Sequence, residues 1–147
     1  MKRNQTVCFN IKTSWHAISR MYNEYGQGYG LTTSMGYVLL NIDVNGTPAT
    51  KIGPLLGMES RSLSRMLKSL EENDLIYRRQ DEKDKRLYKI FLTEKGREKR
   101  ELAKKVVKKF NNVVRDQVSE HKLGIFFEVI EKINNIIDQK KNTEITF

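Results

Sequence analysis

The chain has 147 residues, enough for one domain with a hydrophobic core or for two small subdomains that share helices. Hydrophobic residues make up 38% and charged residues 31%, and the formal net charge of +9 favours an anionic partner, nucleic acid before an acidic membrane surface. A single cysteine excludes an intrachain disulfide and a cysteine-based zinc site, and the lack of a long apolar run excludes a membrane-spanning helix, so we expect a cytoplasmic protein.

The first two helices are predicted from the spacing of apolar side chains. Residues 9–25 carry an apolar and aromatic stripe at spacings of four and three residues, which favours an amphipathic helix. The glycine-rich run at 26–30 should end this helix, because glycine tolerates the backbone geometry of helix stops. A second helix is expected from Thr33 or Ser34 to about Asp43, and it should be buried because it is apolar nearly all round.

A short helix is predicted after the Asn-Gly turn that follows. Thr47 and Pro48 match a helix N-cap followed by proline at the first helical position. Pro54 should kink this helix or shift its start, because proline removes an amide donor. Gly57 should close the helix, and the next helix begins three or four residues later.

The helix predicted at about 60–73 divides into two faces when its residues are placed at intervals of about 100°. The apolar face, which can pack on a core, consists of Leu63, Met66, Leu67 and Leu70. The opposite face carries no large apolar side chain and consists of Arg61, Ser64, Arg65, Lys68 and Glu72. A short helix, a glycine turn and a polar-faced second helix form the helix-turn-helix pattern, although an ordinary amphipathic surface helix has the same periodicity.

Two antiparallel strands are predicted at 75–79 and 87–92, joined by a polar segment. Basic residues outnumber acidic ones between Arg78 and Lys89. A basic hairpin directly after a basic-faced helix offers two adjacent sites for DNA phosphates. The sequence therefore indicates a mainly helical fold with a small antiparallel β-wing, in the order α-α-α-α-β-β-α-α.

Two long amphipathic helices are predicted at the end of the chain. Thr93 should cap a helix from about Glu94 towards Val118, and a second apolar repeat runs from Leu123 to about Gln139. Together with the aromatic stripe of the first helix, they present more apolar surface than one small winged-helix core can bury. We therefore expect a homodimer, the alternative being that these helices pack only within one chain.

At this point the chain resembles the MarR family of bacterial transcription regulators, which are winged helix-turn-helix homodimers. The likeness rests on Ser60-Arg61-Ser62-Leu63-Ser64-Arg65 with Leu67 and Leu70, on Leu75-Ile76-Tyr77-Arg78, on Asp81, Asp84 and Arg86, and on Leu92-Thr93-Glu94-Lys95-Gly96. The segment DEKDKR is similar to the family pattern D-x-R-D-x-R, with Lys83 replacing the first arginine. Asp74 stands where the family usually has glycine, and aspartate is one of the residues that tolerate the left-handed conformation.

The resemblance implies that the helix at 60–73 enters the major groove and that the hairpin at 80–87 is the wing. The candidate DNA contacts of the helix are Ser60, Arg61, Ser62, Ser64, Arg65 and Lys68, with Ser60 also a candidate helix cap. The candidates of the wing are Arg79, Lys83, Asp84, Lys85 and Arg86, with Asp84 expected to orient Arg86. A single chain, 1–147, would then hold a DNA-binding region at 32–96 and a helical dimerisation region at 1–25 and 100–147.

The resemblance also implies a pocket for a small aromatic or carboxylate effector between the first helices and the DNA-binding region. Its candidate lining residues are Trp15, His16, Ser19, Arg20, Met35 and Tyr37. The alternative is that Trp15 belongs to the dimer core and His16 lies on the surface. Cys8 is a candidate redox sensor, against the alternative of a passive cysteine. We expect no metal and no resident cofactor.

The sequence as a whole predicts a regulator that binds specific double-stranded DNA, acting as a homodimer on a pseudo-palindromic operator and as a ligand-responsive repressor. The alternative is a basic helical adaptor that binds an acidic protein or a membrane surface. An enzyme is disfavoured, because the sequence shows no nucleophile–base motif, metal cluster or phosphate-cradling glycine loop.

Overall fold

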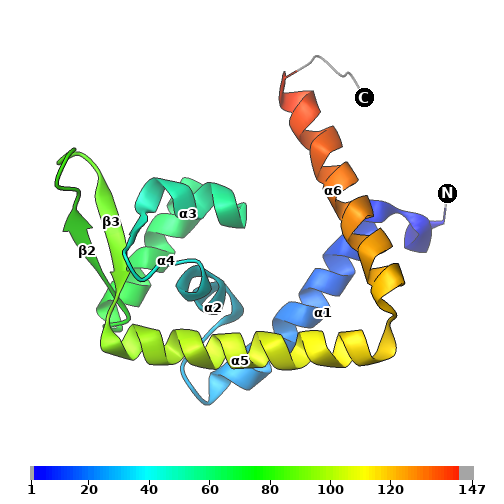
Figure 1. The fold of residues 1–147 in the computed structure, drawn as a ribbon, viewed down its shortest axis with the longest axis horizontal. Helices are drawn as coiled ribbons and strands as arrows, with labels where there is room; N and C mark the ends of the chain where they lie inside the picture. The colour runs from blue at the N-terminus through cyan, green and yellow to red at the C-terminus, as the bar shows by residue number, and fades with distance from the viewer. Residues whose placement is uncertain (1, 143–147) are drawn as a thin grey trace. The chain divides into compact units, whose positions relative to one another are not determined.

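The computed structural model describes residues 2–142, with the backbone alone for residues 3 and 140–142. The helices are the short 3-10 helix η1 (Arg3–Gln5) and the α-helices α1 (Val7–Gln27), α2 (Thr33–Leu40), α3 (Ala49–Leu56), α4 (Ser60–Glu72), α5 (Glu94–Gln117) and α6 (Glu120–Asn142). The strands are β1 (Thr47–Pro48), β2 (Ile76–Gln80) and β3 (Tyr88–Leu92) (Figure 1). The chain divides into two compact units between Val106 and Val107, and α5 contributes to both. The predicted mainly helical fold with a small antiparallel wing is confirmed.

The antiparallel sheet has three strands, in the order β1-β3-β2, where two were predicted. The prediction that Thr47 and Pro48 start a helix is wrong, because Thr47 pairs with Ile90 in the sheet and α3 begins at Ala49. The Thr47 hydroxyl instead accepts a hydrogen bond from the Asp43 N–H at 2.8 Å, which closes the preceding turn. Proline is tolerated in β1 because this strand lies at the edge of the sheet.

The short helix α3 contains Pro54. Of the two expected effects of this proline, a kink or a shifted start, the shift does not occur, because α3 begins at Ala49 and Pro54 lies inside it. The helix ends where predicted, because Gly57 adopts the left-handed conformation at φ 62°.

The core of the first unit lies between α2, α3, α4 and the sheet. Its fully buried side chains are Val38, Leu39, Ile42, Ile52, Leu70 and Ile90. The predicted apolar face of α4 packs into this core, with Leu63, Leu67 and Leu70 buried and Met66 half-buried against them. As a result, the opposite face of α4 is held away from the core.

The turn between α4 and β2 is clamped by the start of α5. Asp74 has φ 57° and is the one non-glycine residue with positive φ among the described residues, as its place in the sequence predicted. The Thr93 hydroxyl donates to the Asp74 carbonyl at 2.7 Å and accepts from the Gly96 N–H at 2.9 Å, so Thr93 caps α5 as expected. Gly96 lies so close to the turn that an added Cβ would overlap the Leu75 carbonyl oxygen.

We expect Gly96→Ala to lower the free energy of unfolding by about 1–3 kcal/mol, because the methyl group would push the Leu75 carbonyl out of place. Urea denaturation followed by circular dichroism measures the change. The control is Gly28→Ala, where an added Cβ meets nothing within 4 Å and φ is −66°, and there the change should stay within about 0.5 kcal/mol. Equal losses in both variants would contradict the close approach at Gly96.

Candidate nucleic-acid interface

The outward face of α4 presents a basic and hydroxyl-bearing surface. Ser60, Arg61, Ser64 and Arg65 are all exposed and together line a shallow hollow. Neither arginine forms an ion pair within residues 2–142, so both guanidinium groups are available to a ligand. Ser60 is the first residue of α4 and not its cap, because the N-cap position is Glu59.

The remaining α4 candidates, Ser62 and Lys68, are less accessible to a DNA ligand. Ser62 is half-buried, at the border between the exposed face and the core. Lys68 is exposed and lies 3.8 Å from the Glu72 carboxylate, one helical turn along, in a contact with side-chain exposures of 75% and 65%. Ion pairs that exposed are weak, so the Lys68 ammonium can exchange Glu72 for another anion.

The tip of the β2–β3 hairpin is a turn held by two aspartates. Asp81 Oδ1 accepts from the backbone N–H groups of Lys83 at 2.9 Å and Asp84 at 3.1 Å, while Oδ2 lies 3.5 Å from Lys89 Nζ. The backbone bonds from Lys83 and then Asp84, followed by the charge of Lys89, hold the pKa of Asp81 below its usual value. The turn therefore depends on an ionised Asp81, which was recognised in the sequence as part of the wing pattern but not as a contact candidate.

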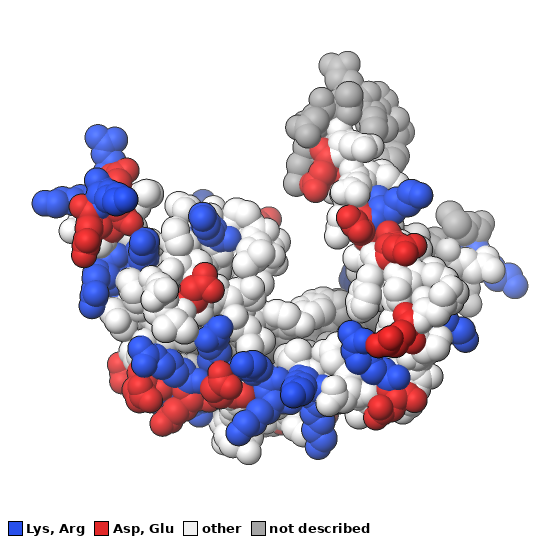
Figure 2. All heavy atoms as spheres, viewed as in Figure 1, with Lys and Arg blue, Asp and Glu red and all other residues white. Residues whose placement is uncertain are grey.

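Asp84 acts on the backbone of the wing. Its Oδ1 accepts from the backbone N–H of Arg86 at 3.0 Å, and no ion pair joins the two side chains in the described part of the chain. Asp84 therefore shapes the turn that carries Arg86 and does not hold its guanidinium. The exposed cations that this turn presents are Lys83, Lys85 and Arg86, and Figure 2 shows Lys and Arg side chains interleaved with acidic ones at this hairpin.

Arg79 lies on the outer face of the sheet, over an aromatic pair. The Tyr77 and Phe91 rings stack with centroids 5.4 Å apart and planes 15° apart. The Arg79 guanidinium carbon lies 5.7 Å from the Tyr77 centroid and 5.3 Å from that of Phe91. These distances allow cation–π attraction, which restrains Arg79 while its side chain stays exposed. The period-two pattern of the strands could have indicated this aromatic platform, but the sequence analysis did not.

The candidate effector residues are only partly brought together. The Trp15 and Tyr37 rings lie 5.6 Å apart, and burial raises the pKa of the Tyr37 hydroxyl. Met35 is a core residue, 8% exposed, whereas His16 is exposed. Arg20 lines a hollow at the end of α1 that contains neither aromatic residue of the pair.

Two further candidates take up no defined role in the structure. Ser19 is half-buried, and its carbonyl accepts from the Thr33 hydroxyl at 2.9 Å, so its contact serves the packing of α1 on α2. Cys8 is exposed near the start of α1.

Among the residues that the structure describes, no three His, Cys, Asp or Glu side chains are grouped to hold a metal ion. No helix in the same part of the chain is long and apolar enough to cross a membrane.

The chain is similar in sequence and in fold to known transcriptional regulators. The MarR family model matches residues 38–88. The HTH-type transcriptional regulator SarZ of Staphylococcus aureus (strain USA300) is 31% identical over 139 residues, which cover 92% of this chain and 89% of SarZ. Among solved structures, the transcriptional regulator SlyA has a TM-score of 0.84 at 22% identity, over 92% of this chain and 96% of that one. The S. aureus MepR–DNA complex has a TM-score of 0.80 at 21% identity, over 88% and 97%.

The aspartate bonds at the wing tip lead to a prediction about single amides. Asp81→Ala should speed hydrogen exchange at the Lys83 and Asp84 amides, because both lose their acceptor. Asp84→Ala should speed exchange at the Arg86 amide and leave Lys83 unchanged. Exchange measured residue by residue by NMR tests this, and uniform changes across the hairpin in both variants would contradict separate roles.

The hydrogen bonds accepted by Asp81 also make the stability of the wing turn depend on pH. Because the folded pKa of Asp81 is lowered, its stabilisation of the turn is fully present above the unfolded pKa of about 3.8 and is lost as pH falls through the folded value. Protection of the Lys83 amide should therefore be constant from about pH 8 to pH 5 and fail only in stronger acid, once intrinsic exchange rates are corrected for. Loss of protection between pH 7 and 5 would contradict this assignment.

Proposed function

The chain belongs to the MarR family of DNA-binding transcriptional regulators, and on that premise we propose that it is a homodimeric repressor that binds a pseudo-palindromic operator and is released by a small organic ligand. We also propose that the chain is not an enzyme and that it acts in the cytoplasm. One observation carries it: the face of α4 opposite the buried leucines presents Arg61 and Arg65, exposed and without ion-pair partners among the described residues.

Base reading is assigned to α4. An arginine that reaches a guanine can donate two hydrogen bonds to its O6 and N7 atoms in the major groove, which gives about 1–3 kcal/mol of discrimination against other bases. Arg61 and Arg65 are one helical turn apart, so both can face the same groove. The similar MepR structure is of a complex with DNA, which supports DNA as the ligand of this chain.

Phosphate binding is assigned to the wing. Lys83, Lys85 and Arg86 project from a turn whose backbone is fixed by the two aspartates, so little freedom is lost when they meet DNA. Lysine at position 83 presents a point charge and not the planar fork of arginine, which suits a phosphate better than a base edge.

Exposed apolar side chains on the terminal helices support the homodimer. In α1 they include Val7, Phe9 and Ile11, and in α6 they include Ile125, Phe126, Phe127, Val129, Ile136 and Ile137, each between 36% and 55% exposed. Several exposed large apolar side chains on one helix are typical of an interface with another chain. A two-fold dimer would present two copies of α4 to the two half-sites of an operator.

The ligand is proposed to be a small aromatic or carboxylate compound. Trp15 is 44% exposed and packs against the more buried Tyr37, so the pair offers an aromatic surface that solvent can reach. An aromatic ligand can stack on that surface. We therefore favour Trp15 and Tyr37 over the other four candidate residues of the effector pocket.

The function is tested by comparing two arginines. An operator is first selected from a random duplex pool, and a scrambled duplex of equal length serves as the non-specific ligand. Arg65→Ala should weaken operator binding about tenfold or more and scrambled binding much less, because a base contact is lost. Arg86→Ala should weaken both and reduce the slope of log affinity against log salt by about 2, because each of the two Arg86 side chains of the dimer loses a phosphate contact.

The matched control is Arg97→Ala, which removes an exposed arginine of α5 that is paired with Glu94 and is not assigned to DNA. Its operator affinity should equal that of the wild-type protein. If Arg65→Ala behaves like this control on both duplexes, α4 is not the reading helix.

A further inference from the structure

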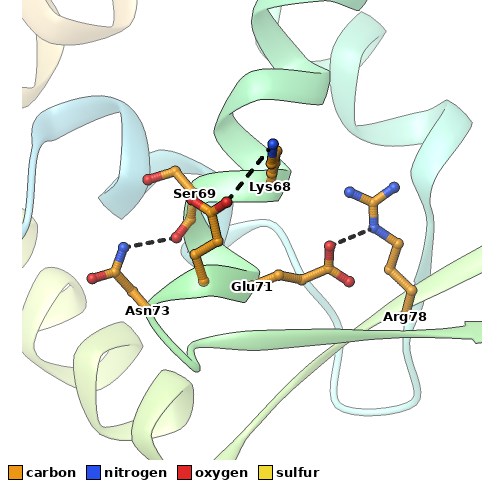
Figure 3. Close-up of polar contacts among 6 residues, drawn as sticks. Lys68, Ser69, Glu71, Asn73 and Arg78 are labelled. Carbon is orange, nitrogen blue, oxygen red and sulfur yellow. Dashed lines mark hydrogen bonds and ion pairs between the residues drawn. The ribbon is translucent and has the colours of Figure 1, made fainter.

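The junction between α4 and the wing contains an ion pair that the DNA-contact assignments leave unused. The helix ends at Glu72 and β2 begins at Ile76, so only residues 73–75 connect them. Across this short turn, Arg78 Nε donates to Glu71 Oε2 at 3.0 Å, and Figure 3 shows the two side chains extending toward each other from the helix and the strand. We propose that Arg78 is a positioning residue, which through Glu71 sets the direction of the wing relative to the recognition helix.

The two consecutive arginines of β2 face opposite sides of the sheet, because side chains alternate along a strand. Arg78 pairs in register with the buried Ile90 and so lies on the face that meets α4. Arg79 pairs with Lys89 and lies on the outer face, over Tyr77 and Phe91. Of the two, only Arg78 can therefore brace the strand against the helix.

The other hydrogen bonds at this junction hold the turn, while Ile76, the first residue of β2, is buried in the same core as the α4 leucines. Lys95 Nζ donates to the Asn73 carbonyl at 2.9 Å, the Asn73 amide donates to the Ser69 carbonyl at 2.8 Å, and the Thr93 hydroxyl holds the Asp74 carbonyl. All of these, together with the backbone hydrogen bonds that Leu75 makes with Leu70 and Thr93, act at or before Leu75. The Glu71–Arg78 bond spans the turn and joins the last turn of α4 to the middle of β2, so it acts as a cross-brace on the angle between them.

The charges around Arg78 argue against a direct phosphate contact. Its Nε–H is already committed to Glu71, and a carboxylate 3.0 Å away repels a phosphate approaching the same guanidinium. The two side chains are 38% and 34% exposed, so the pair adds little to global stability. A hydrogen bond to a charged acceptor is nevertheless directional, which suits it to fix an angle.

The inference rests on the proposed function, since it concerns how the two DNA-binding elements are aligned. The two explanations, alignment of the wing and simple charge, predict different changes in DNA affinity for the two variants. If only charge mattered, Glu71→Gln would strengthen binding to every duplex and Arg78→Gln would weaken it. If the pair aligns the wing, both variants lower the ratio of operator affinity to scrambled affinity, because only the operator needs helix and wing in register.

The test measures dissociation constants by fluorescence anisotropy for the selected operator and the scrambled duplex, over a range of salt concentrations. Glu71→Gln and Arg78→Gln should each reduce the operator-to-scrambled ratio about three- to tenfold, and the salt slope of Arg78→Gln should stay at the wild-type value. The exchanged double variant E71R/R78E should recover the ratio to within about twofold, because the pair is restored with its polarity reversed.

Glu94→Gln is the control, because it removes an exposed carboxylate that pairs with Arg97 within α5 and not with the wing. The ratio of operator affinity to scrambled affinity should be the same for this control as for the wild-type protein. Retained binding to the scrambled duplex, together with an unchanged thermal melting curve, shows that each variant is folded.

Four outcomes would overturn the inference: opposite effects of the two single variants, a salt slope reduced by about 2 in Arg78→Gln, no recovery in the double variant, or single variants that discriminate as well as the wild-type protein. The first two would make Arg78 a phosphate contact. A wild-type protein that does not distinguish operator from scrambled duplex would instead reject the proposed function. If the wild-type protein discriminates and the variants do so equally well, only the role of Arg78 and Glu71 is rejected.

Discussion

The burial of three leucines on one face of α4 is the constraint on which the DNA-binding surface depends. Leu63, Leu67 and Leu70 insert into a core built from α2, α3 and the sheet, and together they fix the rotation of α4 about its own axis. With that rotation fixed, Arg61 and Arg65 must face outward, since they lie on the other side of the helix. The chemistry of the exposed face is thus a consequence of hydrophobic packing on the hidden one.

The wing adds a second surface whose position depends on the backbone. The left-handed Asp74 turns the chain out of α4, and Gly96 lets the start of α5 approach that turn closely. At the far end of the hairpin, Asp81 and Asp84 fold the tip by accepting backbone N–H groups. Acidic residues in this basic hairpin therefore serve the shape of the turn, and the cations beside them are left exposed.

The parts of the structure that were predicted correctly are those governed by local rules. The period of 3.6 residues was enough to divide α4 into its two faces. The turn at Asp74 was identified from the resemblance to a family that has glycine there, and the tolerance of aspartate for the left-handed conformation explains why the turn is kept. The strand β1 was missed because Thr47 and Pro48 resemble a helix start, and only pairing with β3 makes them a strand. Two residues carry too little pattern to reveal such a long-range pairing.

The site was predictable to a similar extent. Exposed arginines follow from helical periodicity, whereas the Glu71–Arg78 bond depends on the angle between a helix and a strand, which no local pattern determines. The bond from Asp84 to the backbone of Arg86 depends in the same way on the path of the turn. Met35 was a candidate for the effector pocket because of the resemblance to the family, and the structure buries it in the core.

The central claim is that α4 and the wing form one surface for the DNA backbone and base edges. The most direct test is the affinity of the wild-type protein for its selected operator as salt rises from about 50 to 200 mM. Because each phosphate contact releases condensed counterions, a dimer that makes six or more such contacts should lose about 10³-fold or more in affinity, with log affinity falling linearly against log salt. An affinity that stays flat over this range would contradict the claim.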